Sequence, residues 1–470
     1  MAGIISVGAY VPFQRLEGAA VRGVWGAGNP KASRPLAGFD EDPITMGTEA
    51  LINAGGWGGI DLDALYFAST SAPYAEKSSA AVVAAAADVP ESAFTADMGG
   101  SLRAGTAALR VALDAVKAGS AKRAAVVASE MRPARAGGPD ELALCDGAAA
   151  LIVGNGGEGD EVAAEVEAVY SWTEDFIDRW RLPGEDQVSA GDAKFIQDYG
   201  YVRQTAATVE GLLAGAGATR EDVGRVLIYA PDARTHAAIC RKLGFPAEAY
   251  PELPLVARMG DAGAAAPLLV LSEALQSAEP GEHILIAGHG SGGDAFLLRA
   301  TDRVAELKER RGVAWCAGRA RPISNYGKFL RSRELVAGEE LNIFSSPSIL
   351  WKESRQTMRL MAGKCRCCGE IQFPRQRLCT NCNARDDWDE VKLGRLGTIY
   401  TFVHDHLPPS PDGYVTMASV DIEGGGRLYG QMTDCDKEAV SVGAPVEMTF
   451  RLLHKGEGYY NYYWKFRPAE

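Results

Sequence analysis

The sequence has no apolar segment long enough to cross a bilayer, which takes roughly 20 residues in a helix. Its most apolar run, AAVVAAAADV at residues 80–89, is short and rich in alanine. The opening residues, MAGIISVGAYVPFQRL, lack the basic segment followed by a long apolar run that marks a secretory signal. These absences predict a soluble, cytoplasmic protein without a membrane partner.

Positive charge is also scarce. The 470 residues hold 48 Lys and Arg against 61 Asp and Glu, which gives a net charge of −13. This balance argues against a nucleic-acid-binding protein. One stretch departs from it, because residues 303–385 carry 17 basic side chains against 7 acidic ones. Such a stretch suits an anionic small ligand or an acidic partner surface, and equally a solvated linker.

Cysteine is sparse outside one short segment. Five of the nine cysteines lie between residues 365 and 382, a distribution typical of one metal site in a reducing compartment rather than of a disulfide framework. Two CxxC units separated by ten residues supply four thiolates, which fill the tetrahedral shell of a structural Zn²⁺ and leave no open position for catalysis. The predicted zinc ligands are Cys365, Cys368, Cys379 and Cys382.

Apolar residues are plentiful enough for more than one core. At 47% hydrophobic, a chain of this length predicts two to four domains. Over the first 300 residues short apolar strands alternate with alanine-rich helices, which predicts an α/β layered fold with two similar halves. Strands are expected at 3–11, 62–70, 124–130, 148–154 and 223–231, helices at 79–89, 103–119, 206–217 and 265–278, and a closing hairpin at 283–301.

The pattern changes after Thr301. Residues 303–360 are polar and are expected to be helical, and the cysteine-rich segment and a tail of short strands follow. Strands expected at 397–406, 414–422, 426–432 and 444–453, separated by turns, predict a small β-barrel. The predicted domains are 1–165 and 166–335 as the two halves of the large fold, 336–362 as a helical linker, 363–390 as a zinc ribbon and 391–470 as an OB-fold.

Several motifs together resemble the thiolase superfamily. The branch that looks nearest is archaeal-type 3-hydroxy-3-methylglutaryl-CoA synthase with its ketoacyl synthase III relatives, over about residues 1–335. The remainder resembles the zinc-ribbon/OB-fold proteins that accompany such enzymes as acyl-CoA-binding partners. The resemblance implies a duplicated, five-layered thiolase-type fold, a rubredoxin-like zinc ribbon, an OB barrel and a homodimer. The motifs are MAGIISVGAYVP, SAPYAEKSSAAVVAAAADVP, SLRAGTAAL, CDGAAALIVG, MGDAGAAAPLLVL and GHGSGGDAF.

The catalytic residues of that family are replaced in this sequence. The family's cysteine nucleophile falls at Leu102, its catalytic glutamate at Thr70, its histidine at Tyr229, and the asparagine of the ketoacyl synthases at Asp261. A leucine cannot form a thioester, and the adjacent Ser101 would need a base and an oxyanion hole of its own. Condensation through an acyl-cysteine enzyme is therefore not expected.

The replaced positions still hold groups that can move protons. By resemblance, Tyr229, Asp261, Asp232, His289 and Tyr74 would converge on one pocket. Tyr229 or His289 would act as the base that takes a proton from a β-hydroxyl, with Asp261 orienting a water or the substrate hydroxyl. Simpler interpretations stay open: Tyr229 as a packing residue at a strand end, Asp261 as a helix cap, and His289 as a structural histidine.

The resemblance implies an acyl-CoA-processing enzyme that makes or breaks a C–C bond without an acyl-cysteine intermediate. The preferred reaction is retro-aldol cleavage of a β-hydroxyacyl-CoA, which needs a base and donors for the thioester enolate. The alternatives are a direct acyltransferase and a non-catalytic acyl-CoA-binding scaffold for a thiolase partner subunit. Coenzyme A is expected as the substrate moiety, with its phosphates held by the basic stretch and the ribbon/OB module.

Overall fold

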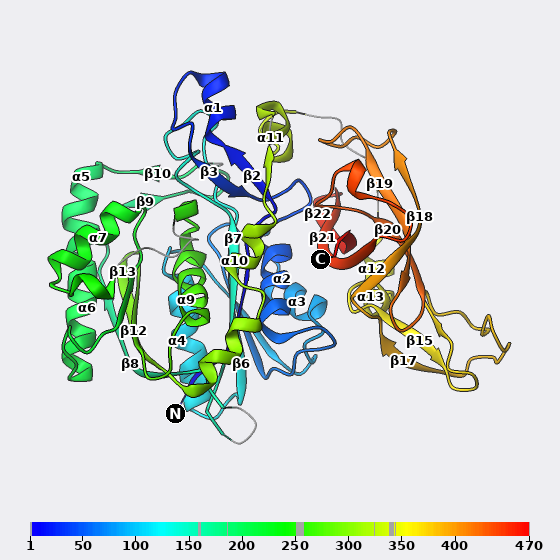
Figure 1. The fold of residues 1–470 in the computed structure, drawn as a ribbon, viewed down its shortest axis with the longest axis horizontal. Coiled ribbons are helices and arrows are strands. Elements are labelled where there is room, and N and C mark those ends of the chain that lie inside the picture. The colour runs from blue at the N-terminus through cyan, green and yellow to red at the C-terminus, as the bar shows by residue number, and fades with distance from the viewer. Residues whose placement is uncertain are drawn as a thin grey trace.

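The computed structural model describes residues 2–157, 161–185, 187–250, 258–323, 325–337, 343 and 345–469. Within them the chain forms a large layered body and a smaller β-rich body, on the left and right of Figure 1. No helix of these ranges is both long and apolar enough to span a membrane.

Nine strands of the described chain form one continuous sheet in the large body. Its central strand, β1 (Gly3–Tyr10), pairs antiparallel with β7 (Gly147–Gly154) on one side and β8 (Ala164–Thr173) on the other, so the sheet passes from one half of the chain into the next. The order across the sheet is β11 (Arg225–Ile228), β12 (His283–His289), β13 (Gly292–Ala300), β8, β1, β7, β6 (Arg123–Glu130), β4 (Ala64–Ala68) and β5 (Phe94–Met98).

Helices lie between and outside the two halves of this sheet. The helices α4 (Ala104–Lys117) and α9 (Ala266–Gln276) contact each other and share one apolar core with strands of both halves, and they lie in the middle of the large body (Figure 1). Layers of helix, sheet, helix, sheet and helix therefore follow one another, as the family resemblance implies. The outer helices are α2 (Pro43–Gly55) and α3 (Ser79–Ala86) on the N-terminal half, and α6 (Arg203–Ala216) and α7 (Ala233–Lys242) on the C-terminal half.

The start of α2 shows how local sequence sets an element that also serves tertiary packing. Asp42 accepts a hydrogen bond from the Thr45 backbone N–H at 2.9 Å, and the Thr45 hydroxyl accepts one from the Asp42 N–H at 2.9 Å. With Pro43 in the first turn, this capping box ends the preceding loop and begins the helix. The second carboxylate oxygen of Asp42 accepts a hydrogen bond at 2.6 Å from Tyr462 in the small body. The helix start is thus tied to the β-barrel.

The small body is a closed five-stranded barrel preceded by a three-stranded ribbon. A bridge between Met432 and Phe466 joins the two edge strands of the barrel, and Trp464 and Phe450 are fully buried inside it. The barrel order is β20 (Arg427–Gln431), β19 (Val415–Ile422), β18 (Leu396–Asp405), β21 (Pro445–Gly456) and β22 (Tyr459–Pro468). The ribbon order is β16 (Ile371–Gln372), β15 (Met361–Cys365) and β17 (Trp388–Lys392).

Two expectations from the sequence differ from the structure. The last strand, β22, is not predicted, because most of its side chains are buried on both faces and its sequence lacks the alternation of a half-exposed strand. The described residues of 303–360 form only short helices, which include the 3-10 helix η4 (Asp302–Glu309), and β14 (Arg321–Ile323) among them pairs with β2 (Gln14–Glu17), which pairs with β3 (Ser33–Leu36). The helices are α10 (Val313–Gly318), α11 (Tyr326–Ser332), α12 (Pro347–Lys352) and α13 (Ser354–Thr357).

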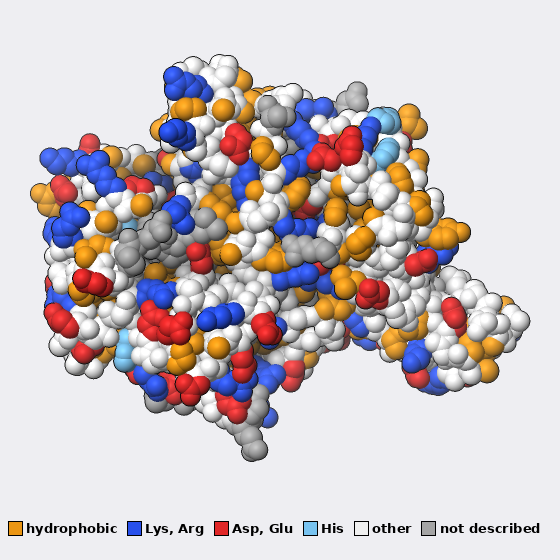
Figure 2. All heavy atoms as spheres, viewed as in Figure 1, with side chains coloured by type: hydrophobic (Ala, Val, Ile, Leu, Met, Phe, Trp, Pro, Cys, Tyr) orange, Lys and Arg blue, Asp and Glu red, His pale blue; other side chains and the backbone are white. Residues whose placement is uncertain are grey.

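The basic stretch at 303–385 is largely ion-paired within the molecule. Arg311 and Arg319 contact Glu447 of the barrel, and Arg333 contacts Asp146 at 2.8 Å. On the face of the molecule shown in Figure 2, basic side chains lie among acidic ones. These cations therefore hold segments together, which leaves fewer of them for coenzyme A phosphates than the sequence suggests. Further pairs are Arg303–Glu161, Arg321–Asp436, Lys328–Asp412, Arg355–Glu390, Arg359–Asp88, Arg366–Asp389 and Arg377–Asp386.

Candidate active site and zinc site

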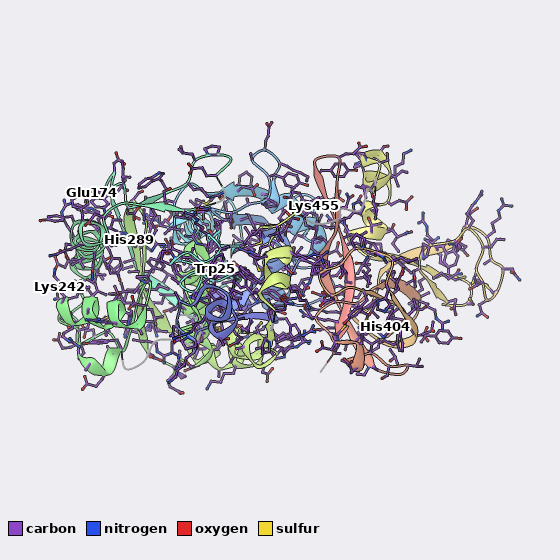
Figure 3. The ribbon with its side chains drawn as sticks, turned by 90° about the horizontal axis from the view of Figure 1, so that it is seen from above. Trp25, Glu174, Lys242, His289, His404 and Lys455 are labelled. Atoms are coloured by element: carbon purple, nitrogen blue, oxygen red, sulfur yellow. The ribbon has the colours of Figure 1, made fainter. Side chains whose placement is uncertain are left out.

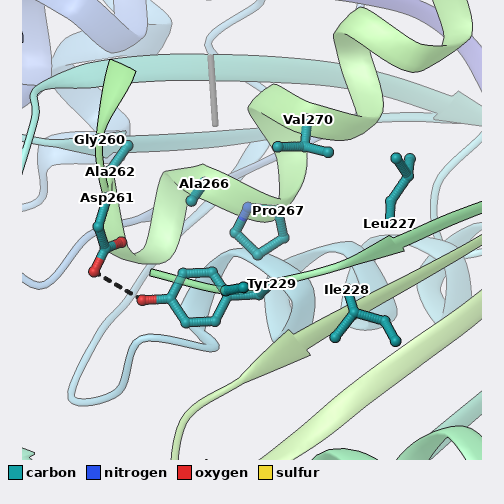
Figure 4. A pocket seen from close by; sticks show the side chains of 10 residues that line it. Leu227, Ile228, Tyr229, Gly260, Asp261, Ala262, Ala266, Pro267 and Val270 are labelled. Carbon is teal, nitrogen blue, oxygen red and sulfur yellow. Dashed lines mark hydrogen bonds between the residues drawn. The ribbon is translucent and has the colours of Figure 1, made fainter. Parts of the chain in front are cut away.

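Tyr229 and Asp261 form the centre of the candidate active site. Tyr229 follows the end of β11, where its backbone N–H donates to the Ala287 carbonyl at 2.8 Å. Its phenol donates a 2.8 Å hydrogen bond to Oδ2 of Asp261, while Oδ1 accepts from the Gly263 N–H at 2.8 Å (Figure 4). Asp261 therefore caps the turn that leads into α9 and also holds Tyr229. The cap interpretation of this carboxylate therefore applies, and its other oxygen is engaged by Tyr229.

The pair lies beside a small pocket between β11 and α9. Aliphatic side chains supply most of its wall, and its free space of about 20 Å³ is room for one water molecule. Burial and the neighbouring Asp261 raise the pKa of Tyr229 well above its ordinary value. At neutral pH the phenol is therefore protonated and acts as the donor. The lining residues are Leu227, Ile228, Tyr229, Ala230, Gly260, Asp261, Ala262, Ala266, Pro267 and Val270.

His289 reaches the same region through Tyr201. The Tyr201 hydroxyl donates to the Tyr229 carbonyl at 2.5 Å, and its ring meets the His289 ring edge-on with centroids 5.3 Å apart. Nε2 of His289 lies 3.4 Å from Oδ2 of Asp178. Burial raises the pKa of Asp178, but hydrogen bonds from His289 and from the Arg179 N–H outweigh burial and lower it below its ordinary value. Figure 3 shows His289 inside the C-terminal half, far from His404 of the barrel.

The position of the family nucleophile contributes no reactive group. Leu102 lies just before α4, and Ser101 next to it donates to the Gly290 carbonyl at 3.0 Å. The loop at Gly290 comes so close that a Cβ there would lie 2.7 Å from the Ser101 hydroxyl and 2.9 Å from the Arg103 N–H nitrogen. Ser101 is therefore engaged with the backbone, and α4 begins without a side-chain nucleophile.

Tyr74 and Asp232 do not join this group, which corrects the expectation that all five residues converge. The hydroxyl of Tyr74 accepts a 2.7 Å hydrogen bond from the Tyr460 N–H of β22, and the two rings pack edge-on. Asp232 is exposed and caps α7, with Oδ1 accepting from the Thr235 N–H at 2.8 Å and Oδ2 from its hydroxyl at 2.9 Å. Both carboxylate oxygens of Asp232 are engaged in capping α7. Tyr74 packs against the barrel and not against Tyr229 and Asp261.

Two buried charges beside the site were missed by the sequence reasoning. Glu130 ends β6 with no exposed surface; its Oε1 accepts from the Thr70 N–H at 2.7 Å and the Thr70 hydroxyl at 2.9 Å, and its Oε2 accepts from the Ser71 hydroxyl at 2.6 Å. Arg132 donates through Nη1 to the Thr70 hydroxyl at 3.1 Å. Charged residues immediately after the apolar run AAVV were the available signal.

A short segment, residues 178–181, lies across the site and is called the strap. It includes β9 (Arg179–Trp180), which pairs with β10 (Ser189–Ala190). Three of its four residues contact the site, so the strap ties together segments that are far apart in sequence. Its contacts are Asp178 with His289 at 3.4 Å, Arg179 with Asp261 at 3.9 Å, and Arg181 with the Thr70 carbonyl at 2.7 Å.

Cys145 and Cys240, two of the three buried cysteines outside the ribbon, are packing residues. Burial raises the pKa of Cys145, and it raises the pKa of Cys240 to about 12. Cys240 lies 3.6 Å from Nε2 of His236, whose own pKa is lowered by burial to about 4. A neutral thiol beside a neutral imidazole is a weak nucleophile at physiological pH. Neither cysteine supplies the missing thiolate.

The zinc ribbon brings its four cysteines together. The sulfur atoms of Cys365, Cys368, Cys379 and Cys382 all lie within 4.8 Å of one another. The Cys365–Cys382 and Cys368–Cys379 sulfur separations are 3.7 and 3.5 Å, close to the edge of about 3.8 Å expected for a tetrahedron with Zn–S bonds of about 2.3 Å. They are far longer than a disulfide bond of about 2.05 Å. The donor set therefore fits a structural Zn²⁺, and Cys367, which is exposed, is not part of it.

The chain matches three described families. Residues 213–299 match the 3-oxoacyl-[acyl-carrier-protein] synthase III C-terminal family, 353–389 the ChsH2 rubredoxin-like zinc ribbon domain, and 390–451 the ChsH2 C-terminal OB-fold domain. The C-terminal matches follow directly on one another and cover the ribbon and most of the barrel.

Curated relatives cover the large body. The hydroxymethylglutaryl-CoA synthase of Archaeoglobus fulgidus is 32% identical over 348 residues, which span 72% of this chain and 99% of that protein. The hydroxymethylglutaryl-CoA synthase of Pyrococcus horikoshii is 31% identical over 337 residues, 70% of this chain and 95% of that protein.

Solved structures share the fold. An HMG-CoA synthase crystallised with CoA has a TM-score of 0.61 at 16% identity, over 73% of this chain and 94% of that one. The 3-oxoacyl-[acyl-carrier-protein] synthase III of Aquifex aeolicus VF5 has a TM-score of 0.56 at 21% identity, over 64% of this chain and all of that one. The five-layered fold is thereby confirmed.

Proposed function

Because the chain belongs to the hydroxymethylglutaryl-CoA synthase family and ends in a ChsH2-type zinc ribbon and OB-fold, we propose that it processes acyl-CoA thioesters by C–C bond chemistry without an acyl-cysteine intermediate. The observation that carries this proposal is the exchange of the nucleophile position for Leu102 together with the 2.8 Å hydrogen bond from Tyr229 to Asp261. The chain therefore keeps a pair of residues that can transfer a proton, Tyr229 and Asp261, although it has no nucleophile at Leu102.

The reaction that such a pair serves is retro-aldol cleavage of a β-hydroxyacyl-CoA. The β-hydroxyl gives its proton to the phenol oxygen of Tyr229, and Tyr229 gives its own proton to Asp261. As the Cα–Cβ bond breaks, Cβ becomes a carbonyl and the bonding electrons form the thioester enolate. The enolate then takes the proton back at Cα, which releases the shorter acyl-CoA.

Tyr229 suits this role as a relay rather than as a preformed phenolate. Its raised pKa keeps the proton on the phenol until a substrate hydroxyl approaches. Asp261, only 4% exposed, already accepts the hydrogen bond from the phenol and is the acceptor for its proton. A base whose proton leaves as the substrate proton arrives avoids a charged tyrosine in the apolar pocket.

The cofactor and partner expectations follow from the same family. The four ribbon cysteines would hold one structural Zn²⁺, which supplies folding free energy to the ribbon and no step of the reaction. Coenzyme A would enter as part of the substrate. The edge strand β5 leaves Phe94 60% exposed beside an unpaired strand edge, a feature that supports a homodimer joined through this edge.

The test is turnover of β-hydroxyacyl-CoA substrates by the purified full-length chain, followed by release of the shorter acyl-CoA and the carbonyl product. Tyr229→Phe and Asp261→Asn should each lower kcat by about 10²-fold or more, the usual contribution of a general base. Tyr429→Phe, at an exposed tyrosine of the barrel, is the matched control and should leave kcat unchanged. Full activity in both site variants would refute the assignment.

A second function is favoured by one observation. The pocket beside Tyr229 has free space of about 20 Å³, room for about one water, and a site this narrow also fits a subunit that binds acyl-CoA and supports a separate thiolase. Addition of a cysteine-bearing thiolase separates the two proposals. Turnover by the chain alone supports the lyase, and turnover that requires the thiolase supports the scaffold.

A further inference from the structure

Arg132 and Arg179 have no part in the proton relay, yet both lie against it. Arg132 is only 4% exposed, in the segment between β6 and β7, and Arg179 lies on the strap with Nη1 3.9 Å from Oδ2 of Asp261. They come from different halves of the large body. Placing two guanidinium groups from distant segments beside one buried site costs desolvation free energy, so a role for them at this site is to be expected.

The surroundings of Arg132 fix its guanidinium in place. A Cβ at Gly263 would lie 3.0 to 3.1 Å from its Cδ, Nε and Nη1 atoms, so the turn that carries Asp261 passes directly over the guanidinium. Its Nη1 donates a hydrogen bond to the Thr70 hydroxyl, and this hydroxyl donates in turn to Oε1 of Glu130. Attraction by Glu130, Asp261 and Tyr229 outweighs burial and raises its pKa. Arg132 is therefore a fixed, permanent positive charge at the site.

Several buried polar atoms around this site lack partners. Among the described residues, Nε of Arg132, Nη1 of Arg179, Nδ1 of His289 and Nε2 of Gln204 are buried without a hydrogen bond. Gln204 belongs to the site because its Oε1 accepts from the Gly292 N–H at 2.9 Å, beside the His289 loop. Buried donors are nearly always satisfied. The unsatisfied N–H groups of Arg132 and Arg179, the two that lie beside Asp261, indicate a ligand that supplies oxygen acceptors.

We propose that Arg132 and Arg179 are the electrophilic half of the active site: their guanidinium groups receive the negative charge that develops on the thioester oxygen of the substrate when the enolate forms. This inference rests on the proposed function, to which it adds the groups that stabilise the enolate oxygen. Tyr229 and Asp261 move the proton, the Cα–Cβ bond breaks, and its electron pair comes to rest on the oxygen that the arginines face. When Cα is reprotonated, this electron pair returns from the oxygen to Cα and forms the new C–H bond.

The position of Thr70 explains how this arrangement replaces the family one. Where the family resemblance places a catalytic glutamate, this chain has Thr70, and Glu130 of the neighbouring strand occupies its hydrogen-bonding groups. Glu130 therefore serves as a positioning residue that holds Arg132 through Thr70. The strap completes the site by bringing Arg179 to Asp261, and fixed donors of this kind stabilise developing charge without reorganisation.

The test compares two non-reactive CoA analogues that differ in charge at the oxygen. S-Carboxymethyl-CoA carries a carboxylate that mimics the enolate, and acetonyl-CoA carries a neutral ketone in the same place. Calorimetric titration of the full chain should show tighter binding of S-carboxymethyl-CoA, by about tenfold to hundredfold for a charge-assisted hydrogen bond. Arg132→Met and Arg179→Gln should each reduce this preference, because the carboxylate of S-carboxymethyl-CoA loses a charge-assisted hydrogen bond and the ketone of acetonyl-CoA loses only a weaker neutral one.

Arg203→Gln is the matched control, since Arg203 is an exposed arginine paired with Glu174 nearby, and it should retain the full preference. If Arg132→Met fails to fold in a thermal melt, Arg179→Gln on the strap decides the question alone. Equal binding of the two analogues by the wild type, or a preference that survives in the folded variants, overturns the inference while the proposed function stands. Failure to bind either analogue overturns both.

Discussion

Removal of the charge of Glu447 is the sharpest available test of how the barrel is held on the large body. Glu447 lies in β21, is 1% exposed, and is surrounded by arginines. Its carboxylate accepts from Arg467 at 2.8 Å and Arg311 at 2.6 Å, with Arg395 at 3.6 Å. Arg395 and Arg467 also contact the buried Glu49 of α2, at 2.7 and 3.2 Å. Glu447→Gln would leave these buried arginines with one negative charge fewer.

The magnitude follows from the pKa of Glu447. Burial raises this pKa, but the arginines outweigh burial and lower it from 4.5 to about 2. A difference of that size corresponds to about 3 kcal/mol of folding free energy at neutral pH. Loss of one partner from a buried ion network costs about 3–5 kcal/mol in other proteins, which agrees. We therefore expect Glu447→Gln to lower the free energy of unfolding by about 3 kcal/mol at pH 7.

The pH dependence gives the prediction its sign. Because the folded-state pKa lies below the unfolded value, the stabilisation is present above pH 4.5 and is lost as the pH falls through about 2. The gap between wild type and variant should shrink to less than half by about pH 3. Urea unfolding at both pH values measures it, and Glu423→Gln, at an exposed glutamate of the same barrel, is the control. A gap below about 0.5 kcal/mol at pH 7, or one that does not shrink in acid, would refute the reasoning.

Two further predictions concern the ribbon and the sheet edge. Cys368→Ser should destabilise the ribbon and reduce bound zinc, measured by elemental analysis, from about one ion per chain to near zero. Cys367→Ser, outside the ligand set, is the control and should retain the metal. Equal zinc in both variants would contradict the proposed site. The proposed homodimer predicts that the wild type sediments as a dimer and that Phe94→Lys at the β5 edge sediments as a monomer. Val442→Lys on the exposed barrel surface is the control; a monomeric wild type would refute the homodimer, and an unchanged dimer in Phe94→Lys would place the interface elsewhere.

Much of the fold could be predicted because it depends on local patterns. The strands β1, β6, β7 and β12 are apolar runs of the right length between turn residues, and α4 and α9 follow helical periodicity. The zinc ligands could be predicted for a similar reason, since a CxxC unit fixes the spacing of its two thiolates within one turn. Where local signals conflict, as in β22 with its two buried faces, the prediction fails.

The candidate site could be predicted only in part. Tyr229 and Asp261 follow from their places in family motifs, and the structure joins them by a hydrogen bond. Asp232 shares such a motif and yet caps a helix, because an exposed carboxylate three residues before a free N–H satisfies that N–H first. Arg132 and Arg179 lie in no motif, and nothing in their immediate sequence connects either of them with Asp261.

The sequence by itself determined the layered α/β class and the four-cysteine group of the ribbon, because both depend on residue types at short spacing. The family resemblance added that Leu102 stands where the family has its cysteine nucleophile. The tertiary structure alone decided which charges meet. Thr70, Arg132, Arg179 and Asp261 come from four separate segments, and only the closure of the two halves over one another brings them within contact. Electrostatic interactions depend on distance in space rather than along the chain, so the hydrogen bond from Tyr229 to Asp261 and the arginines beside it become visible only in the folded molecule.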